Sequence, residues 1–356
     1  MSFHVVRVRA PSRLHFGLLS FGGTSKRQFG GVGVMVDAPG LSITFRRADR
    51  LSATGPLAER ALEFARRFAA HWQPADRGRG DAVQSAAWMT AAGGEPAAHI
   101  EIESAPPAHV GMGTGTQLGL AVAAGLARLA CAASGTARGR TAGDAPPDRV
   151  SDREAVRWAR WVGRGERSAI GTHGFARGGL LVEGGKQAAA TVSPLISRLE
   201  LPDAWRFVLL VDREKRGLSG AQECRAFADL PPTGPEATAA LCREVLVDLL
   251  PAAAEGDFDA FAESLYRYGH EAGLLFAQRQ GGAYAAGLQT ELVAWLRAQG
   301  VRGVGQSSWG PTIFALTRDS AEAAALAAEV GRHFAAANLL AIVAAPANRG
   351  ALVECE

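Results

Sequence analysis

A glycine-rich stretch is the first place in this sequence where residue types and spacing suggest chemistry. Residues 107–117 read PAHVGMGTGTQ, follow the alternating segment 97–104 and precede an Ala- and Leu-rich segment from Leu118 to about Ala133. Glycine lets a backbone turn tightly and approach a ligand, and the first turn of a helix presents unpaired amides to an anion. The alternative is a strand-to-helix turn that binds nothing. The predicted phosphate or pyrophosphate site consists of Gly111, Gly113, Thr114, Gly115, Thr116 and Gln117.

Two basic residues lie at the end of the first expected strand. Residues 12–18 read SRLHFGL, and Arg13 and His15 are two residues apart, so a strand places both on one face. Together with Ser12 they could bind a phosphate or a carboxylate. An ordinary surface pair is the alternative interpretation.

Two further segments carry charged residues between glycines. In 163–179, Glu166 lies between arginines, so it is a candidate ligand of Mg²⁺ or an ion-pair partner of Arg167. After the apolar segment 207–212, the basic tip with Lys215, Arg216 and Ser219 is either a phosphate contact or a solvated charge run. The paired acids of the familiar phosphoribosyltransferase loop are missing from that tip.

A last glycine-rich segment, 303–311, reads GVGQSSWGP and adds Gln306, Ser307 and Ser308 to the candidate residues. Glycine- and hydroxyl-rich segments cost folding entropy, so their recurrence in one chain suggests loops that converge on a ligand. The alternative is turn punctuation in a protein that contains 43 glycines.

Composition narrows the class of protein. The chain has 356 residues, of which 47% are apolar and 21% charged, which suits two packed lobes with a sizeable core. The net charge is +3 and no basic run is interleaved with aromatic residues, so we expect no nucleic-acid partner. No apolar stretch is long enough to span a membrane and no signal-peptide pattern opens the chain, so we expect a cytoplasmic protein.

Hydrophobic periodicity predicts an α+β fold with a first lobe over 1–195 and a second over 205–356. The expected strands are 3–10, a strand pair at 32–38 and 41–46 that turns at Pro39-Gly40, 97–104, 207–212, 312–317 and 340–345. The expected helices are 57–72, the one after the glycine-rich stretch, 153–162, 236–250, 257–278, 284–299 and 320–337. Residues 73–96 read as a loop or insertion, and 134–152 as a disordered segment.

Taken together, these segments resemble the superfamily of galactokinase, homoserine kinase, mevalonate kinase and phosphomevalonate kinase. Pro107 to Thr116 match its phosphate loop. The resemblance implies a two-lobed fold with a ribosomal protein S5 domain 2-like N-terminal lobe and a ferredoxin-like C-terminal lobe. In many of these kinases an acid accepts the proton of the acceptor hydroxyl, whereas Gly171, Thr172 and His173 occupy that register here.

More closely, five ordered segments resemble the beta-ribofuranosylaminobenzene 5'-phosphate synthase family: SRLHFGLL, PPAHVGMGTGTQ, the GTHGFARGG run, KRGLSG and GQSSWGPTIFAL. The resemblance implies a decarboxylating transfer from phosphoribosyl pyrophosphate to 4-aminobenzoate, or in some members 4-hydroxybenzoate, early in tetrahydromethanopterin synthesis. It also implies Mg²⁺, no ATP turnover and commonly a homodimer. Arg13, His15 and His173 are then the candidate catalytic residues, with His173 orienting substrate instead of acting as a base.

Two other classes of function remain open from the sequence. An ATP-dependent kinase for a small hydroxylated metabolite is the leading alternative, because the phosphate loop and the fold are shared with that class. A non-catalytic nucleotide-binding regulator is a third, although it would not require so many polar loop residues.

Overall fold

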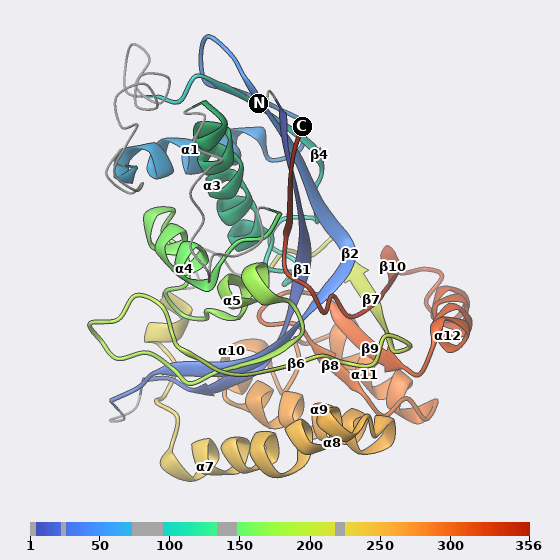
Figure 1. Cartoon of the computed structure of the whole chain (residues 1–356). Helices are drawn as coiled ribbons and strands as arrows, with labels where there is room; N and C mark the ends of the chain where they lie inside the picture. Colours follow the sequence, from blue (N-terminus) through green and yellow to red (C-terminus); the bar gives the residue numbers. More distant parts are fainter. Residues whose placement is uncertain (1–4, 23–25, 73–94, 134–147, 218–224) are drawn as a thin grey trace.

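Two β-sheets and the helices packed on them form the two lobes of this protein (Figure 1). The computed structural model describes residues 5–22, 26–72, 95–133, 148–217 and 225–356. The segments expected to be irregular, 73–96 and 134–152, lie mostly outside the described residues. Of the second, residues 148–152 are described, and there the Ser151 side chain caps a helix in a capping box with Glu154.

The first sheet contains seven strands, and its two longest strands form an antiparallel pair at its centre. The path is β11-β1-β2-β4-β3, with β5 paired to β2 and β6 paired to β5. Its strands are β1 (Val5–Ser20), β2 (Phe29–Arg47), β3 (Ser52–Thr54), β4 (Ala98–Ser104), β5 (Leu180–Glu183), β6 (Leu195–Leu199) and β11 (Leu352–Cys355).

Three features of this sheet differ from the sequence-based expectation. The expected pair 32–38 and 41–46 is one strand, β2, because both halves pair with β1 across a register shift between Ala10 and Ser12. The expected first strand continues to Ser20 for the same reason. At the other end of the chain, β11 pairs with β1, so the lobe expected over 205–356 returns its last strand to the first sheet.

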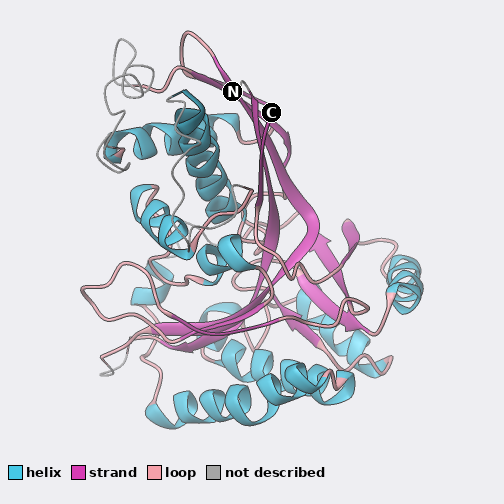
Figure 2. Cartoon of the chain, in the orientation of Figure 1, coloured by secondary structure: helices cyan, strands magenta, loops and turns pink. Residues whose placement is uncertain are grey.

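Helices cover one face of the first sheet, as Figure 2 shows. They are α1 (Ala58–His71), α3 (Thr114–Ala133), α4 (Asp152–Trp161) and α5 (Ile170–Arg177). The hydrophobic core between them and the sheet includes Phe45, Phe68 and Trp158. Helix α3 begins at Thr114 instead of Leu118, so the end of the glycine-rich stretch forms the first turn of a buried helix.

The second sheet has the antiparallel order β10-β7-β9-β8, which is the order of a ferredoxin-like lobe as expected. Its strands are β7 (Arg206–Asp212), β8 (Val304–Gln306), β9 (Ile313–Thr317) and β10 (Leu339–Ala344). The accompanying helices are α7 (Pro235–Arg243), a π-helical turn (Glu244–Leu249), α8 (Leu250–Glu255), α9 (Phe258–Leu274), α10 (Ala277–Gln280), α11 (Leu288–Ala298) and α12 (Ser320–His333). None of the helices in the described ranges is long and apolar enough to cross a membrane.

Alternating side chains of the second sheet fill two separate cores. Phe207 and Phe314 belong to a core shared with β1, β2 and α9, whereas Val208 and Ile313 belong to a core under α11 and α12. The shared core joins the lobes: the rings of Phe16 and Phe314 have centroids 5.2 Å apart. The two lobes are therefore fixed to each other along β1.

The packing of α3 against the first sheet depends on a glycine. A Cβ atom added to Gly125 would lie 2.2 Å from Cε2 of the fully buried Phe45. We predict that Gly125→Ala lowers the free energy of unfolding by about 1–3 kcal/mol, because the ring must move within a dense core. Urea denaturation measures this change.

The matched control is Gly331→Ala on α12, where an added Cβ meets nothing within 4 Å. That variant should be neutral or more stable by up to about 1 kcal/mol, because alanine has the higher helix propensity. Equal losses in the two variants would contradict the packing argument.

Candidate functional site

A cavity of about 480 Å³ lies between the lobes and brings together segments that are far apart in the sequence. Its walls include β1, the glycine-rich loop with the start of α3, residues 163–168, the end of α9 with α10, and residues 306–310. The glycine- and hydroxyl-rich segments at 12–18, 111–117, 163–179 and 303–311 therefore converge, as the sequence predicts. The candidate residues that line the cavity are Arg13, His15, Gly111, Gly113, Thr114, Gly115, Thr116, Glu166, Arg167, Gln306 and Ser308.

The glycine-rich loop is held by the loop at 306–310. The Ser307 hydroxyl donates a hydrogen bond to the carbonyl of Gly111 at 2.7 Å and accepts one from the backbone N–H of His15 at 3.0 Å. An added Cβ on Gly111 would lie 2.3 Å from the Ser307 carbonyl, and one on Gly310 would lie 2.2 Å from the Val110 carbonyl. Ser307 thus joins three backbones, and it does so from behind the loop, since its side chain does not line the cavity.

Arginines surround the first turn of α3. An added Cβ on Gly115 would be 2.6 Å from Nη2 of Arg60 and 3.3 Å from Nη2 of Arg164. The Arg164 Nε donates to the hydroxyl of Thr116 at 3.2 Å. Positive guanidinium groups beside helix N-terminal amides form an arrangement that binds phosphate or pyrophosphate.

The charge balance of the cavity favours an anionic ligand. Among the described residues that line it, four are arginines (Arg13, Arg60, Arg164 and Arg167) and one is a carboxylate, Glu166. Burial, together with Arg60, Arg164 and Arg216, lowers the pKa of His109, so this histidine is held in its neutral form. The positive charge of the cavity therefore resides on arginines.

His15 is a buried neutral side chain in the same wall. It is 4% exposed, and burial and the neighbouring Arg13 lower its pKa well below the ordinary value. Its Nε2 has no hydrogen-bond partner among the described residues. A neutral imidazole with an unused ring nitrogen at the cavity wall can hydrogen-bond to a ligand.

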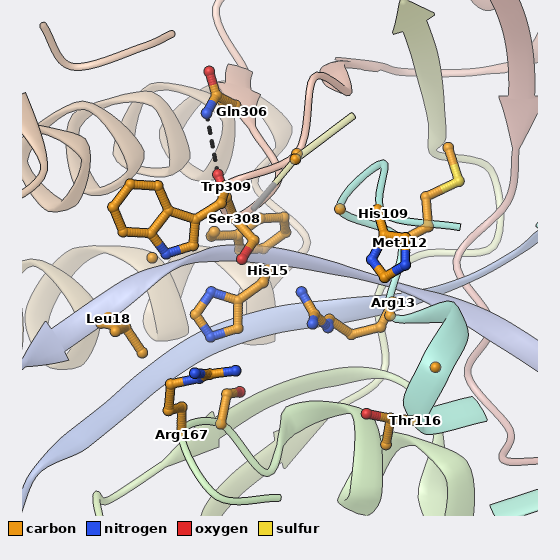
Figure 3. Close-up of a pocket in the computed structure, with 18 of the residues that line it drawn as sticks. Arg13, His15, Leu18, His109, Met112, Thr116, Arg167, Gln306, Ser308 and Trp309 are labelled. Atoms are coloured by element: carbon orange, nitrogen blue, oxygen red, sulfur yellow. Dashed lines mark hydrogen bonds between the residues drawn. The ribbon is translucent and has the colours of Figure 1, made fainter. Parts of the chain in front are cut away.

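The other end of the cavity is aromatic. The ring of Trp309 lies 4.7 Å from that of Phe276 and 5.6 Å from that of Phe227, centroid to centroid. The Arg167 guanidinium lies over the Phe227 ring at 5.7 Å. In Figure 3, Arg13, His109 and Thr116 lie on one side of the view, and Trp309 and Leu18 on the other. The cavity thus has an anion-binding end and an aromatic end.

Metal ligands of the protein itself are few in this cavity. No group of three or more His, Cys, Asp or Glu residues in the described ranges is placed to hold a metal ion. Glu166, the one carboxylate among the described lining residues, is exposed. Such a donor set fits a Mg²⁺ ion that is held mainly by substrate phosphates and by one or two carboxylates.

Comparison with known proteins decides the family. The chain is 30% identical over 331 residues to a protein of Archaeoglobus fulgidus named beta-ribofuranosylphenol 5'-phosphate synthase, and the match covers 89% of each chain. The chain belongs to this family. A relative of the same name from Methanothermobacter thermautotrophicus is 27% identical, with 87% of this chain and 88% of the relative covered.

Solved structures of other proteins confirm the fold of this chain. A homoserine kinase from Cytophaga hutchinsonii superposes with a TM-score of 0.61 at 16% identity, covering 98% of this chain and 97% of the kinase. Mevalonate-3-kinase from Thermoplasma acidophilum gives 0.60 at 10% identity, covering 99% of each chain. A family model described as "GHMP kinases C terminal" matches residues 249–336. The predicted α+β fold of this kinase superfamily is confirmed.

The structure places His173 away from the cavity wall, and its predicted role in orienting substrate stays a prediction. It lies on α5, is 6% exposed and does not line the cavity. Its Nε2 donates to the carbonyl of Ser193 at 2.8 Å, and burial lowers its pKa. This hydrogen bond links α5 to the segment that carries Ser193.

Four further candidates, Ser12, Gln117, Gly171 and Thr172, also lie outside the cavity wall. Gln117 is fully buried and donates through Nε2 to the carbonyl of Gly171 at 2.9 Å, which ties α3 to α5. Thr172 follows Gly171 on the buried α5. Ser12 donates to the carbonyl of Pro39 at 2.6 Å and supports the bend of β2. Gln117 and Ser12 thus connect segments next to the cavity, and the predicted substrate contacts of these residues stay predictions.

The basic tip after β7 is only partly at the site. Lys215 donates to Gln289 at 2.9 Å, and Arg216 donates to backbone carbonyls of its own turn. Arg216 is still close enough to lower the pKa of His109. The backbone of Gly217 lines the cavity and donates to the His109 carbonyl at 2.6 Å. Ser219 lies outside the described residues.

Several residues of the cavity wall were not predicted from the sequence. They are Arg60, Arg164 and the aromatic residues Phe227, Phe276 and Trp309. The sequence predicts a helix over 57–72 but gives no local signal that Arg60, outside its buried apolar face, reaches a ligand. A tryptophan between serine and glycine in the late glycine-rich segment was the one available pointer to an aromatic wall.

Gly113 provides a test of the anion-binding end. Its φ is 71°, and an added Cβ would lie 3.0 Å from Cβ and 3.2 Å from Nε of Arg13. We predict that Gly113→Val weakens binding of inorganic pyrophosphate by at least about tenfold, because the side chain displaces Arg13 and blocks the approach to the loop. Isothermal titration calorimetry measures the affinity.

Gly300→Val is the matched control, because Gly300 has a comparable φ of 86° with nothing within 4 Å of an added Cβ. It imposes similar backbone strain far from the cavity and should leave pyrophosphate affinity unchanged. Unchanged affinity in a folded Gly113→Val variant would contradict the assignment of this loop.

The buried His15 should make stability depend on pH. The unfolded chain protonates this residue near pH 6.5, whereas the folded protein resists protonation, so lowering the pH favours unfolding. When the pH is lowered from about 7.5 to about 5.5, the free energy of unfolding should fall in both proteins. The fall should be larger in the native protein than in His15→Asn, by up to about 1.4 kcal/mol. Denaturation at both pH values measures the difference, and an equal loss in both proteins would show that His15 protonates normally in the fold.

Proposed function

We propose that this protein is a glycosyltransferase that joins phosphoribosyl pyrophosphate to 4-hydroxybenzoate or 4-aminobenzoate, releasing CO₂ and pyrophosphate. The observation that carries the proposal is the match to relatives named beta-ribofuranosylphenol 5'-phosphate synthase over nearly the whole of both chains. A phenol product arises when the acceptor is 4-hydroxybenzoate and its carboxylate is lost. The anion-binding and aromatic ends of the cavity suit the two substrates.

The first lobe would bind the leaving group. As the bond between ribose C1 and pyrophosphate breaks, negative charge grows on the pyrophosphate and the ribose gains oxocarbenium character. The amides at the start of α3, with Arg13, Arg60 and Arg164 in the cavity wall beside them, would stabilise that charge. The arginine side chains remain protonated over any physiological pH range.

The acceptor ring supplies the new bond. Its carbon that bears the carboxylate attacks ribose C1, pushed by electron donation from the para substituent. The bond to the carboxylate then breaks, CO₂ leaves, and the electron pair restores the aromatic ring. Because no proton is removed from a ring carbon, the reaction needs no strong base at the cavity wall. His15, whose pKa is lowered, is a weak base and would serve as a hydrogen-bonding group.

Mg²⁺ is the proposed cofactor. The residue that would hold it is Glu166, together with oxygens of the substrate pyrophosphate, and when bound the ion would mask charge on the leaving group. Homodimer formation and a cytoplasmic location stay predictions.

The activity has a direct test. With Mg²⁺, phosphoribosyl pyrophosphate and carboxyl-labelled 4-hydroxybenzoate, the purified protein should release labelled CO₂ and pyrophosphate in equal amounts, because each turnover expels both. EDTA should stop the reaction and ATP should not be consumed. Parallel assays with 4-aminobenzoate compare the two acceptors. The kinase alternative predicts ADP formation with a hydroxylated acceptor and no CO₂; that result would overturn the proposal.

A pair of arginines on α1 provides the matched variants. Arg60→Met should raise KM for phosphoribosyl pyrophosphate by at least about tenfold, since it removes a charged partner of the phosphates. Arg66→Met should have no effect, because Arg66 is exposed on the same helix and pairs with Glu95 away from the cavity. Equal KM values in the two variants would show that Arg60 does not bind the substrate.

A further inference from the structure

Gln280 has one half of its side-chain amide fixed and the other half unused. Its Nε2 donates to the carbonyl of Gly273 at 3.1 Å and to the carbonyl of Ala283 at 2.9 Å. Both partners are carbonyl oxygens, which only accept, so the amide nitrogen must face them. Among the residues that the structure describes, none donates to its Oε1, although Gln280 lines the cavity.

The segment that carries Gln280 is rigid. An added Cβ on Gly273 would lie 2.1 Å from the Ala283 carbonyl, so the two backbones touch at the end of α9. The backbone N–H of Gln280 donates to Phe276 at 3.1 Å and its carbonyl accepts from Ala286 at 3.0 Å. Gln280 therefore presents a fixed acceptor oxygen, not a mobile side chain.

The other amide side chain in the cavity wall is already used at both ends. Gln306 accepts from the backbone N–H of Ala285 at 2.8 Å and donates to the carbonyl of Ser308 at 3.1 Å. It thereby ties the α10–α11 connection to the loop that carries Trp309. Of the two glutamines that line the cavity in the described part of the chain, Gln280 alone has an unused acceptor to offer a ligand.

Gln280 lies beside the aromatic end of the cavity. It is four residues after Phe276, on the same side of a helical turn, and Phe276 is in ring contact with Trp309. These rings belong to a small apolar cluster with Leu18 and Phe21 that is separate from the main cores. A flat aromatic ligand can lie against such walls, and any polar group on it then needs a specific partner.

The proposed reaction sets the direction of the acceptor ring. The ring carbon that bears the carboxylate must face ribose C1 and hence the arginines around α3. The para substituent lies at the opposite end of the ring, so it points away from the anion-binding end and toward the aromatic end. Hydroxyl and amino groups at that position both donate hydrogen bonds.

We propose that Oε1 of Gln280 accepts a hydrogen bond from the para substituent of the acceptor and so selects benzoates that carry a para donor. The inference rests on the proposed function for the direction of the ring. One carbonyl oxygen accepts from either a hydroxyl or an amino group, so this contact separates donors from non-donors and does not separate 4-hydroxybenzoate from 4-aminobenzoate. A site built around such a hydrogen bond rejects analogues that leave it unpaired.

Gln280 also has a structural role, because it satisfies a carbonyl at the end of α9. That role uses only Nε2, so its loss would lower stability without changing the order of ligand affinities. Ligand selectivity is therefore the measurement that separates the two roles.

The test compares binding of 4-hydroxybenzoate with that of 4-fluorobenzoate, which has a similar size and no para donor. Isothermal titration of the native protein should give about tenfold tighter binding of 4-hydroxybenzoate, the effect expected of one buried hydrogen bond. Gln280→Met should remove this preference while leaving pyrophosphate affinity unchanged. Gln278→Met is the matched control, since Gln278 is the same residue type on the same turn, is exposed and does not line the cavity; it should keep the preference.

Each outcome bears on the proposal. Equal affinities of the native protein for the two benzoates would overturn it, even if Gln280→Met failed to fold. A preference that survives in a folded Gln280→Met variant would overturn it as well. If the preference depends on Gln280 but no CO₂ is released in the activity assay, the proposed function fails and the donor-selecting contact stands. If CO₂ is released without any preference, the function stands and this inference fails.

Discussion

Close approach of two loop backbones is the constraint on which the site depends. Gly111 lies against the Ser307 carbonyl and Gly310 against the Val110 carbonyl, at distances that leave no space for a Cβ atom. The Ser307 hydroxyl then bridges this contact to β1 through the N–H of His15. Three segments from opposite ends of the chain are thereby held at fixed separation. The start of α3 and the cavity wall made by β1 are preorganised before any ligand arrives.

Burial in this region determines which groups carry charge. Desolvation lowers the pKa of both His15 and His109, and neighbouring arginines lower it further. The two histidines are therefore neutral hydrogen-bonding groups near neutral pH, while the arginines stay charged. As a result, the attraction of the cavity for phosphates changes little with pH. A histidine-based anion site would lose its charge near neutrality.

The two lobes contribute different chemistry to one cavity. The first lobe supplies α3, Arg60 and Arg164 at the anion-binding end, and the second supplies Phe276 and Gln280 at the aromatic end. Strand β1 contributes to both ends of the cavity. Its Arg13 lies at the anion-binding end, and its Leu18 belongs to the apolar cluster at the aromatic end. Kinases with the same fold share only 10–16% identity with this chain. One fold can therefore carry different cavity walls, and the residues of the wall determine which acceptor binds.

Local patterns in the sequence determined the fold class, the glycine-rich loop and the shared face of Arg13 and His15, because these follow from neighbours along the chain. Tertiary structure decided the rest. Position in a motif could not show that α5 lies outside the cavity wall, where His173 contacts the carbonyl of Ser193. Arg60 gave no local signal, since it lies beside Gly115, 55 positions further along the chain. Gln280 gave none either, because its place in the cavity wall depends on how the end of α9 and the loop of Trp309 pack together. The reason is physical: a cavity wall is defined by packing between distant segments, which one-dimensional spacing does not encode.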